Sequence, residues 1–174
     1  MVQAATYLAT ELLRNGRWVE IRALRPDDRS DLIAAVERSS AQSLYRRFLG
    51  AKRHFSEQEI AFFVNVDFIN HVALVAVMED EDGPMIIGGG RYVVWEPGKA
   101  EVAFAVIDQY QGQGVGSALM RHLVAIARQA GLKELTAEVL SDNNPMLKVF
   151  EKTGLRLRRK RDATVMHLVL ELDG

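Results

Sequence analysis

The sequence contains no cysteine among its 174 residues. This absence excludes disulfide bonds, thiolate metal sites and a cysteine that would carry an acyl group during a transfer reaction. No apolar run approaches the length of about 18 residues that a membrane-spanning helix needs. We expect no secretion signal, because Thr10, Glu11 and Arg14 interrupt the N-terminal apolar pattern. The net charge of −1 gives no overall attraction to nucleic acid or anionic membranes. Because the sequence has no cysteine, the chain is expected to be cytoplasmic.

The rest of the composition is that of an ordinary globular domain. Hydrophobic residues make up 48% of the chain and charged residues 26%, and the length is sufficient for one domain with a sizeable core. We expect residues 1–17 to form an N-terminal arm or helix and residues 18–174 to form a single domain. No metal site is expected, since the four histidines show no ligand spacing; they are His54, His71, His122 and His167.

The periodicity of apolar residues predicts one α/β domain. Strands are expected where apolar residues alternate or run together, and helices where they recur every three or four residues. Three consecutive glycines at 88–90 lie inside an expected strand and predict a β-bulge or a close backbone approach. The expected strands are 18–24, 72–78, 85–95, 100–107, 134–140, 155–160 and 165–172, and the expected helices begin at Pro26 or cover 43–48, 60–66, 119–130 and 144–154, with Asn144 as the cap of the last.

A glycine-rich turn between an expected strand and an expected helix predicts a site for a diphosphate. Bare backbone N–H groups at a helix N-terminus attract negative charge, and glycine allows the phosphate oxygens to approach closely. An ordinary strand-to-helix turn is the alternative interpretation of so short a segment. The residues of the turn are Gln111, Gly112, Gln113, Gly114, Val115, Gly116 and Ser117.

The spacing of the turn narrows the choice of ligand. The phosphate-binding loop of ATPases and GTPases is not present, and the dinucleotide-binding pattern fails because Ser117 replaces its third glycine. What remains is Gln-x-x-Gly-x-Gly, formed by Gln111, Gly114 and Gly116. This pattern resembles the acetyl-CoA-binding signature of the GNAT N-acetyltransferases.

The resemblance implies an α/β GNAT fold. In that fold a single mixed, mostly antiparallel sheet is flanked by helices, and its fourth and fifth strands splay around acetyl-CoA as the cosubstrate. The backbone of Ala105, Val106 and Ile107 would then pair with the pantetheine amides. The N–H of Val106 would polarise the thioester carbonyl.

The segment 100–107 resembles the fourth strand of that superfamily. Several protein lysine acetyltransferases place a catalytic glutamate at the position of Glu101. An amine arrives protonated, so the reaction needs a base, and half-burial among apolar neighbours would raise the pKa of Glu101 to suit that role. The alternative is a surface glutamate that pairs with Lys99 or with a cross-strand partner.

A second segment, residues 143–155, resembles the motif Asn-x-x-Ala-x-x-Leu-Tyr-x-Lys-x-Gly-Phe. Asn143 takes the position that contacts pantetheine in the family, unless it is simply a turn residue. Phe150 stands where a tyrosine often protonates the departing CoA thiolate, and Leu155 replaces the usual phenylalanine. A phenyl ring has no proton to donate, so water would have to protonate a thiolate whose pKa is about 8.5.

The similarity extends to the Pat-type bacterial protein lysine acetyltransferases over roughly residues 18–155. It is carried by residues 19–28, 43–48 and 55–60, by Asp67 and by residues 72–76. Pat-type enzymes acetylate an active-site lysine of acyl-CoA synthetases and so inactivate them. Many of them carry a second domain, and we expect this chain to be a stand-alone catalytic module.

Two groups of charged residues allow more than one interpretation. Tyr45, Arg46 and Arg47 would either line the acceptor site or belong to an amphipathic helix. The basic run at 156–161 is expected to be a solvated strand face, with docking of an acidic substrate surface or of the CoA 3′-phosphate as the alternative.

These patterns predict an acetyl-CoA-dependent N-acetyltransferase that uses no metal and acts by direct attack of the acceptor amine. The expected partner is a protein with a reactive lysine, such as an acyl-CoA synthetase. An enzyme for small-molecule amines on the same fold is one alternative, because fold does not choose the acceptor. A non-catalytic acyl-CoA-binding sensor is another, in view of Phe150. The acceptor, the acyl-chain preference, the regulation and the oligomeric state stay open.

Overall fold

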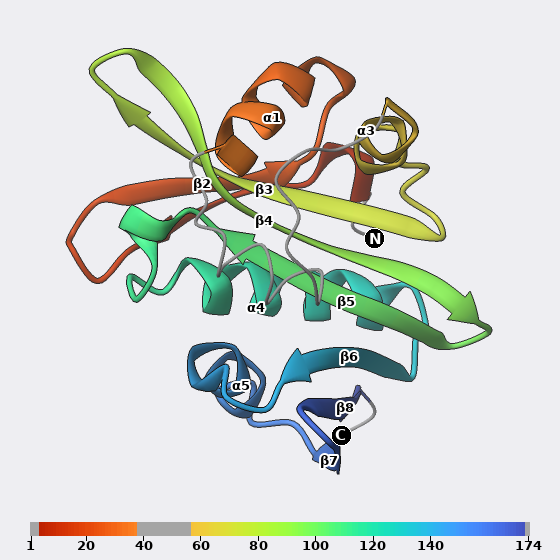
Figure 1. The fold of residues 1–174 in the computed structure, drawn as a ribbon. Helices are drawn as coiled ribbons and strands as arrows, with labels where there is room; N and C mark the ends of the chain where they lie inside the picture. Colours follow the sequence, from red (N-terminus) through yellow and green to blue (C-terminus); the bar gives the residue numbers. More distant parts are fainter. Residues whose placement is uncertain (1–3, 38–56, 173–174) are drawn as a thin grey trace.

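The computed structural model describes residues 4–37 and 57–172. In these residues one mixed sheet of eight strands has the order β1-β2-β3-β4-β5-β6-β8-β7 (Figure 1). The strands are β1 (Leu8–Leu12), β2 (Trp18–Ala23), β3 (His71–Asp80), β4 (Gly83–Glu96), β5 (Lys99–Val106), β6 (Glu134–Leu140), β7 (Leu157–Asp162) and β8 (Val165–Glu171). The helices are α1 (Arg29–Glu37), α3 (Glu57–Val64), α4 (Val115–Gln129) and α5 (Asn144–Glu151).

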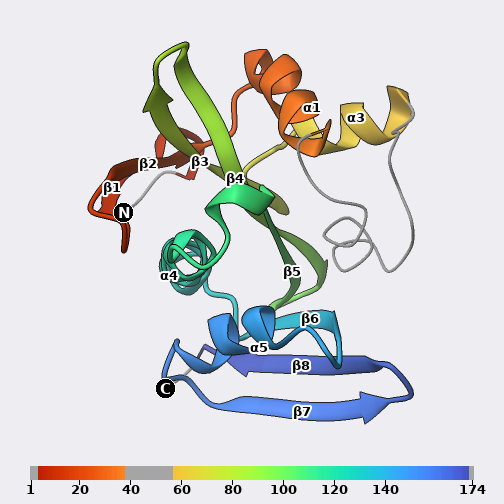
Figure 2. The same ribbon diagram turned by 60° about the vertical axis from the view of Figure 1, so that its left-hand side comes forward.

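The two faces of the sheet carry different helices. Helix α4 lies on one face and helices α1 and α3 lie on the other, while α5 lies beside β6 (Figure 2). The core lies between α4 and the sheet, where Leu119 and Leu123 are completely buried. All neighbouring strands of the described sheet are antiparallel except β5 and β6. The expected mixed, mostly antiparallel sheet flanked by helices is therefore confirmed.

The N-terminal segment differs from the expected arm or helix. A short 3-10 helix (Ala4–Thr6) is followed by β1, which pairs with β2 from Leu8 opposite Arg22 to Leu12 opposite Trp18. Leu8 and Leu12 suggested a helical face, but both are more than half exposed. Glu11, on the opposite face of the strand, bonds to Arg121 and His122 of α4 and so attaches β1 to the core side.

The basic run at 156–161 lies mainly on β7, the edge strand of the sheet. Its side chains are largely exposed, and Arg158 forms ion pairs with Glu134 and Glu171 at 2.9 and 3.2 Å. A charged edge strand resists unwanted pairing with another sheet edge. The solvated strand face expected from the sequence is therefore what the structure has. The expected helix 43–48, with Tyr45, Arg46 and Arg47, lies outside the described residues.

No helix within the described ranges 4–37 and 57–172 is long and apolar enough to cross a membrane.

The glycines at 88–90 allow β4 to pack closely against helix α4 and strand β5. The register between β3 and β4 shifts beside Gly88, where Ala76 pairs with Gly88 and Val77 pairs with Ile86. A Cβ added at Gly88 would lie 3.1 Å from Val115 Cγ1, the first residue of α4. A Cβ at Gly90 would lie 2.7 Å from the ring of Phe104. Both the bulge and the close approach predicted for these glycines are confirmed.

From the close contact at Gly90 we predict the effect of a substitution on stability. Gly90→Ala should lower the free energy of unfolding by about 1–3 kcal/mol, because the added methyl group overlaps the Phe104 ring. Urea unfolding followed by circular dichroism measures the change. Gly89→Ala is the matched control, since its Cβ would lie 3.4 Å from the nearest atom, an ordinary contact. Equal losses in the two variants would contradict the packing argument.

A buried ion pair connects β2 to the turn before α1. Arg22 donates two hydrogen bonds of 2.8 Å to the carboxylate of Asp28, which also accepts the N–H of Arg25 at 2.7 Å. Burial acts to raise the pKa of Asp28, but the hydrogen bonds from Arg22 and Arg25 outweigh it, and the net pKa is lowered. Folding therefore favours the ionised carboxylate.

Asp28→Asn should lower the free energy of unfolding by about 3–5 kcal/mol at pH 7, because it leaves the buried Arg22 guanidinium without a counter-charge. The carboxylate of Asp28 has a lowered pKa in the folded state. Its stabilisation is fully present above the unfolded value of about 3.9 and is lost as the pH falls through the folded value. In urea titrations, the difference in free energy of unfolding between the wild type and Asp28→Asn should thus be large at pH 7 and smaller at pH 3. Asp27→Asn, at the exposed neighbour, is the control. A difference in free energy of unfolding that is equal at the two pH values would refute the ion-pair argument.

Candidate active site

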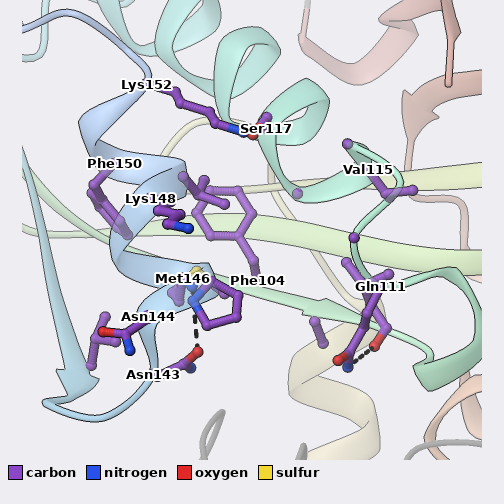
Figure 3. A pocket seen from close by; sticks show the side chains of 18 of the residues that line it. Phe104, Gln111, Val115, Ser117, Asn143, Asn144, Met146, Lys148, Phe150 and Lys152 are labelled. Atoms are coloured by element: carbon purple, nitrogen blue, oxygen red, sulfur yellow. Dashed lines mark hydrogen bonds between the residues drawn. The ribbon is translucent and has the colours of Figure 1, made fainter. Parts of the chain in front are cut away.

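The site begins where β5 and β6 separate. The two strands pair in parallel at Lys99 with Glu134, Ala100 with Leu135 and Glu101 with Thr136, and no further pair follows along these described strands. Beyond this last pair lies a cavity of about 400 Å³. Its walls are residues 102–106 of β5, residues 110–112 and 114–117 of the glycine turn and α4, residues 137–139 of β6, and part of α5 (Figure 3). The expected splaying of these two strands is therefore confirmed.

The exposed edge of β5 presents backbone N–H groups to this cavity. Ile107 donates its N–H to the carbonyl of Ile87 at 2.9 Å, so its backbone faces β4. Consecutive strand residues turn their polar groups to opposite sides, and Val106 and Phe104 therefore direct their N–H groups away from β4 and into the gap. The Val106 carbonyl accepts a hydrogen bond from Gln111 Nε2 at 3.0 Å. An extended chain with amide groups fits this edge.

Of the three β5-end residues expected to bind the cosubstrate, two line the cavity and one does not. Ala105 and Val106 line the cavity, as does the buried neighbour Phe104. Ile107 does not line it, because its side chain is buried and its N–H is already bonded. The N–H of Ile107 is therefore not available to pair with a pantetheine amide, contrary to the expectation.

The glycine turn places an uncapped helix end at the opposite wall of the cavity. Gly112 and Gly114 have φ angles of +80° and +96°, a backbone region that favours glycine. Gly114 is the N-cap of the 15-residue α4 and has no side chain with which to cap it. The first backbone N–H groups of a helix have no partner within the helix, and here they lie at the cavity wall with Val115, Gly116 and Ser117.

The space in front of the turn suits a diphosphate. A Cβ added at Gly112 or Gly114 would have no heavy atom within 4 Å, so both positions open onto free space. The dipole of α4 favours negative charge at this point. Gln111 lines the cavity and ties the turn to the end of β5. Gln113 lies outside the cavity, and its carbonyl instead accepts the N–H of Arg14 at 3.1 Å.

Helix α5 forms the third wall and contributes Asn143 and Phe150. Asn143, and not the expected Asn144, caps the helix, with its side-chain oxygen accepting the Met146 N–H at 3.3 Å. Asn143 is buried and also lines the cavity, so the two interpretations of this residue describe the same position. Phe150 is 1% exposed and meets the Phe104 ring edge to face, with centroids 6.3 Å apart. It supplies a packed wall and no ionisable group.

Glu101 lies at the closed end of the gap, on the sheet face away from α4. Ala100 and Val102 point to the core, so Glu101 points to the other face together with the cavity-lining Ala103 and Ala105. Its carboxylate is exposed, whereas the sequence predicted half-burial. The reason is that residues 99, 101 and 105 belong to the open face of the strand. Glu101 is one position beyond the cavity wall rather than part of it.

Between β3 and β6, the row of register partners at Glu101 contains one other titratable side chain. His71, Val93, Glu101 and Thr136 are register partners in β3, β4, β5 and β6. His71 is buried, and its Nε2 lies 2.9 Å from the Arg91 guanidinium. Burial, with a smaller effect from Arg91, lowers the pKa of His71 to about 4. His71 is therefore uncharged at neutral pH, and Glu101 is the anionic member of this row.

Several cavity residues were not found from the sequence. Arg14 reaches the cavity from the turn between β1 and β2, and its guanidinium donates to the Gly112 carbonyl at 3.3 Å. Lys148 and Lys152 lie on the cavity side of α5, and Figure 3 shows Lys152 directed toward Ser117. The spacing of four between the two lysines was a visible sign of a shared helix face. Nothing local marks Arg14, since a hairpin brings it to the site.

Comparison with known proteins agrees with this geometry. Residues 39–155 match the Acetyltransferase (GNAT) family. The chain is 33% identical over 144 residues to acetyltransferase Pat of Mycolicibacterium smegmatis, covering 82% of this chain and 42% of that protein. It is 32% identical over 137 residues to acetyltransferase PA5475 of Pseudomonas aeruginosa, covering 78% and 74% of the two chains. The crystal structure of the GNAT domain of S. lividans PAT superposes with a TM-score of 0.84 at 34% identity, covering 94% of this chain and 96% of that one.

The chain therefore belongs to the GNAT family of acetyltransferases and is a transferase enzyme. Enzymes of this family use acetyl-CoA. The residues present fit that molecule, because the glycine turn and the N-terminus of α4 suit its diphosphate and the free edge of β5 suits its amide-containing arm. The chain spans less than half the length of the M. smegmatis relative.

The glycine turn allows a test of acetyl-CoA binding. Gly114→Glu should weaken the affinity for acetyl-CoA at least about 100-fold, because it places a carboxylate in the space that suits the diphosphate. Isothermal titration calorimetry measures the dissociation constant. Gly131→Glu is a matched control at the other end of α4, where φ is +83° and an added Cβ would also meet no atom within 4 Å. Equal affinities in the two variants would remove the turn from the binding site.

Proposed function

We propose that the protein is an acetyl-CoA-dependent lysine acetyltransferase whose acceptor is a lysine side chain of a cytoplasmic protein such as an acyl-CoA synthetase. One observation carries the proposal. Glu101 is an exposed carboxylate at the last rung of the β5–β6 pairing, next to the cavity that suits acetyl-CoA. The similarity to proteins named Pat, along nearly the whole described chain, supports a protein acceptor.

In the proposed reaction the cosubstrate supplies an activated acetyl group as a thioester. The N–H groups of the glycine turn and of α4 hold the diphosphate, and the β5 edge at Phe104 and Val106 aligns the pantetheine arm. In this arrangement the Phe104 N–H, which faces the gap nearer to Glu101 than the Val106 N–H does, polarises the acetyl carbonyl. Asn143 contributes a buried amide to the same wall.

Glu101 accepts the proton that the acceptor ammonium must lose before it becomes a nucleophile, either directly or through a water molecule. Its exposure on the face away from α4 lets a protein substrate approach it without displacing the core. Phe150 has no proton to give, and in the proposed reaction water protonates the departing thiolate, whose pKa is about 8.5.

Glu101→Gln tests this mechanism. The substitution keeps the size of the side chain but removes its basicity, so kcat should fall about 100-fold or more while the affinity for acetyl-CoA stays the same. The assay is acetyl transfer to a purified bacterial acetyl-CoA synthetase, with modified lysines located by mass spectrometry. Glu79→Gln, at another exposed glutamate of the sheet, is the control and should retain full activity.

The outcomes separate the candidate functions. Modification of one synthetase lysine, lost in Glu101→Gln, supports both the acceptor class and the base. Full activity of Glu101→Gln would exclude Glu101 as the base. Unmodified synthetase with intact acetyl-CoA binding would overturn the protein-lysine proposal, and transfer to polyamines or amino acids would then identify a small-molecule enzyme. Binding without transfer to any amine would identify a sensor.

A further inference from the structure

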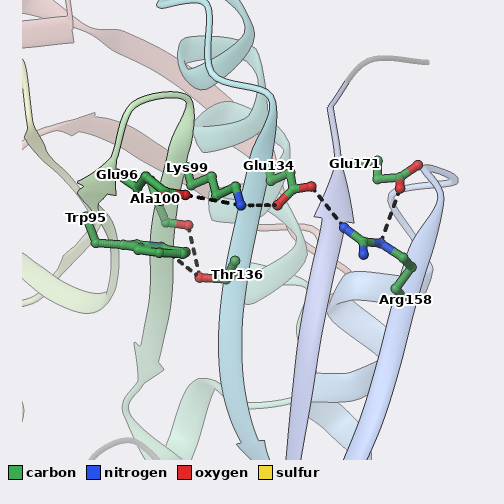
Figure 4. A network of polar contacts seen from close by, with 8 residues as sticks. All are labelled: Trp95, Glu96, Lys99, Ala100, Glu134, Thr136, Arg158 and Glu171. Carbon is green, nitrogen blue, oxygen red and sulfur yellow. Dashed lines mark hydrogen bonds and ion pairs between the residues drawn. The ribbon is translucent and has the colours of Figure 1, made fainter.

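Trp95 is a large aromatic side chain at the end of β4 that is 55% exposed. The register between β4 and β5 shifts here, since Val94 pairs with Ala100 while Glu96 pairs with Lys99. Trp95 is therefore the extra residue of a bulge, and a bulge redirects a side chain relative to the regular strand. The indole is turned across β5 and toward β6, as Figure 4 shows.

The indole ring is held in place by a hydrogen bond. Trp95 Nε1 donates to Thr136 Oγ1 at 3.2 Å, and the same hydroxyl lies 3.4 Å from the Ala100 carbonyl. Thr136 is the register partner of Glu101. The ring thus crosses β5 at the last paired rung, directly beside the position from which Glu101 projects. An aromatic ring fixed before binding loses little conformational entropy when a ligand contacts it.

Lys99 marks one side of the ring. Its Nζ lies 5.6 Å from the ring centroid and 3.1 Å from Glu96 Oε2. Lys99 and Glu101 are two residues apart and project from the same face of β5. Lys99 is part of a chain of charges that continues through Glu134 to Arg158 (Figure 4). The carboxylates of Glu96 and Glu134 compensate the Lys99 ammonium on this side of the indole ring. The carboxylate of Glu101 projects from β5 on the other side of the ring.

We propose that the exposed face of Trp95 receives the aliphatic part of the acceptor lysine and directs its amine to Glu101. This inference rests on the proposed function and specifies how the acceptor is bound. A lysine side chain combines four methylene groups with a terminal cation. The methylene groups suit contact with an aromatic face, the cation is attracted by the ring, and Glu101 supplies the negative charge at the far end. Trp95 is accordingly an acceptor-binding residue.

The test compares tryptophan substitutions in the acetylation of purified acetyl-CoA synthetase. Trp95→Ala should raise KM for the synthetase about tenfold, and the dissociation constant of acetyl-CoA should stay within about twofold. Trp95→Phe keeps an aromatic face and should restore most of the affinity. Trp18→Ala is the matched control. Trp18 is 64% exposed at the start of β2, and β3 and β4 separate this strand from β5 in the sheet.

A second measurement needs no turnover. The chain has two tryptophans, so in Trp18→Phe all indole emission comes from Trp95. Titration with a tryptophan-free peptide that contains the modified synthetase lysine should change this emission in a saturable way. The same peptide with norleucine in place of lysine should bind at least about fivefold more weakly, since it lacks the ammonium that Glu101 and the ring attract.

The results distinguish failure of this inference from failure of the proposed function. A raised KM in Trp95→Ala, rescue by Trp95→Phe and a saturable emission change support it. Lysine acetylation with an unchanged KM in Trp95→Ala overturns the inference and leaves the proposed function intact. If the wild type modifies no synthetase lysine although it binds acetyl-CoA, the proposed function fails and the lysine contact at Trp95 fails with it.

Discussion

The parting of β5 and β6 after three rungs is the constraint on which the site depends. Strand edges that separate inside a protein leave backbone N–H groups without partners, and an unpaired buried group costs about 1–3 kcal/mol. Packing on both sides holds the gap open: Val115 at the start of α4 lies against Gly88, and Phe150 of α5 lies against Phe104. The core thus stabilises an opening whose polar edge is suited to an extended ligand with amide groups.

The local parts of this arrangement could be predicted from the sequence. A glycine turn between a strand and a helix depends on residues within a few positions of one another, so the spacing of Gln111, Gly114 and Gly116 indicated the uncapped helix end. The glycines of β4 likewise predicted a bulge and a close approach, because glycine weakens a strand interior and is typical of positions where the backbone bends or packs closely. The apolar run at 100–107, which leads into the glycine turn, predicted the strand that carries Glu101.

The parts that depend on distant contacts could not be predicted. Arg14 reaches the cavity only because β1 and β2 form a hairpin, and residues 1–17 were expected to be an arm or helix. Leu8 and Leu12 have helical spacing, but pairing with β2 decides their conformation and leaves both exposed. The exposure of Glu101 also depends on which face α4 covers, and periodicity within one strand does not specify that.

In the proposed mechanism, recognition of the two substrates uses different kinds of groups. The glycine turn and the β5 edge would act mainly through backbone N–H groups, whose positions follow from glycine content and strand geometry and depend little on other side chains. In the proposed arrangement, the acceptor is met by the side chains of Glu101 and Trp95, and the direction of Trp95 depends on a one-residue bulge and on Thr136 across the sheet. A motif can therefore identify acetyl-CoA as cosubstrate. In the proposed arrangement, acceptor binding depends on the turn between β4 and β5, because the one-residue bulge there sets the direction of the Trp95 ring.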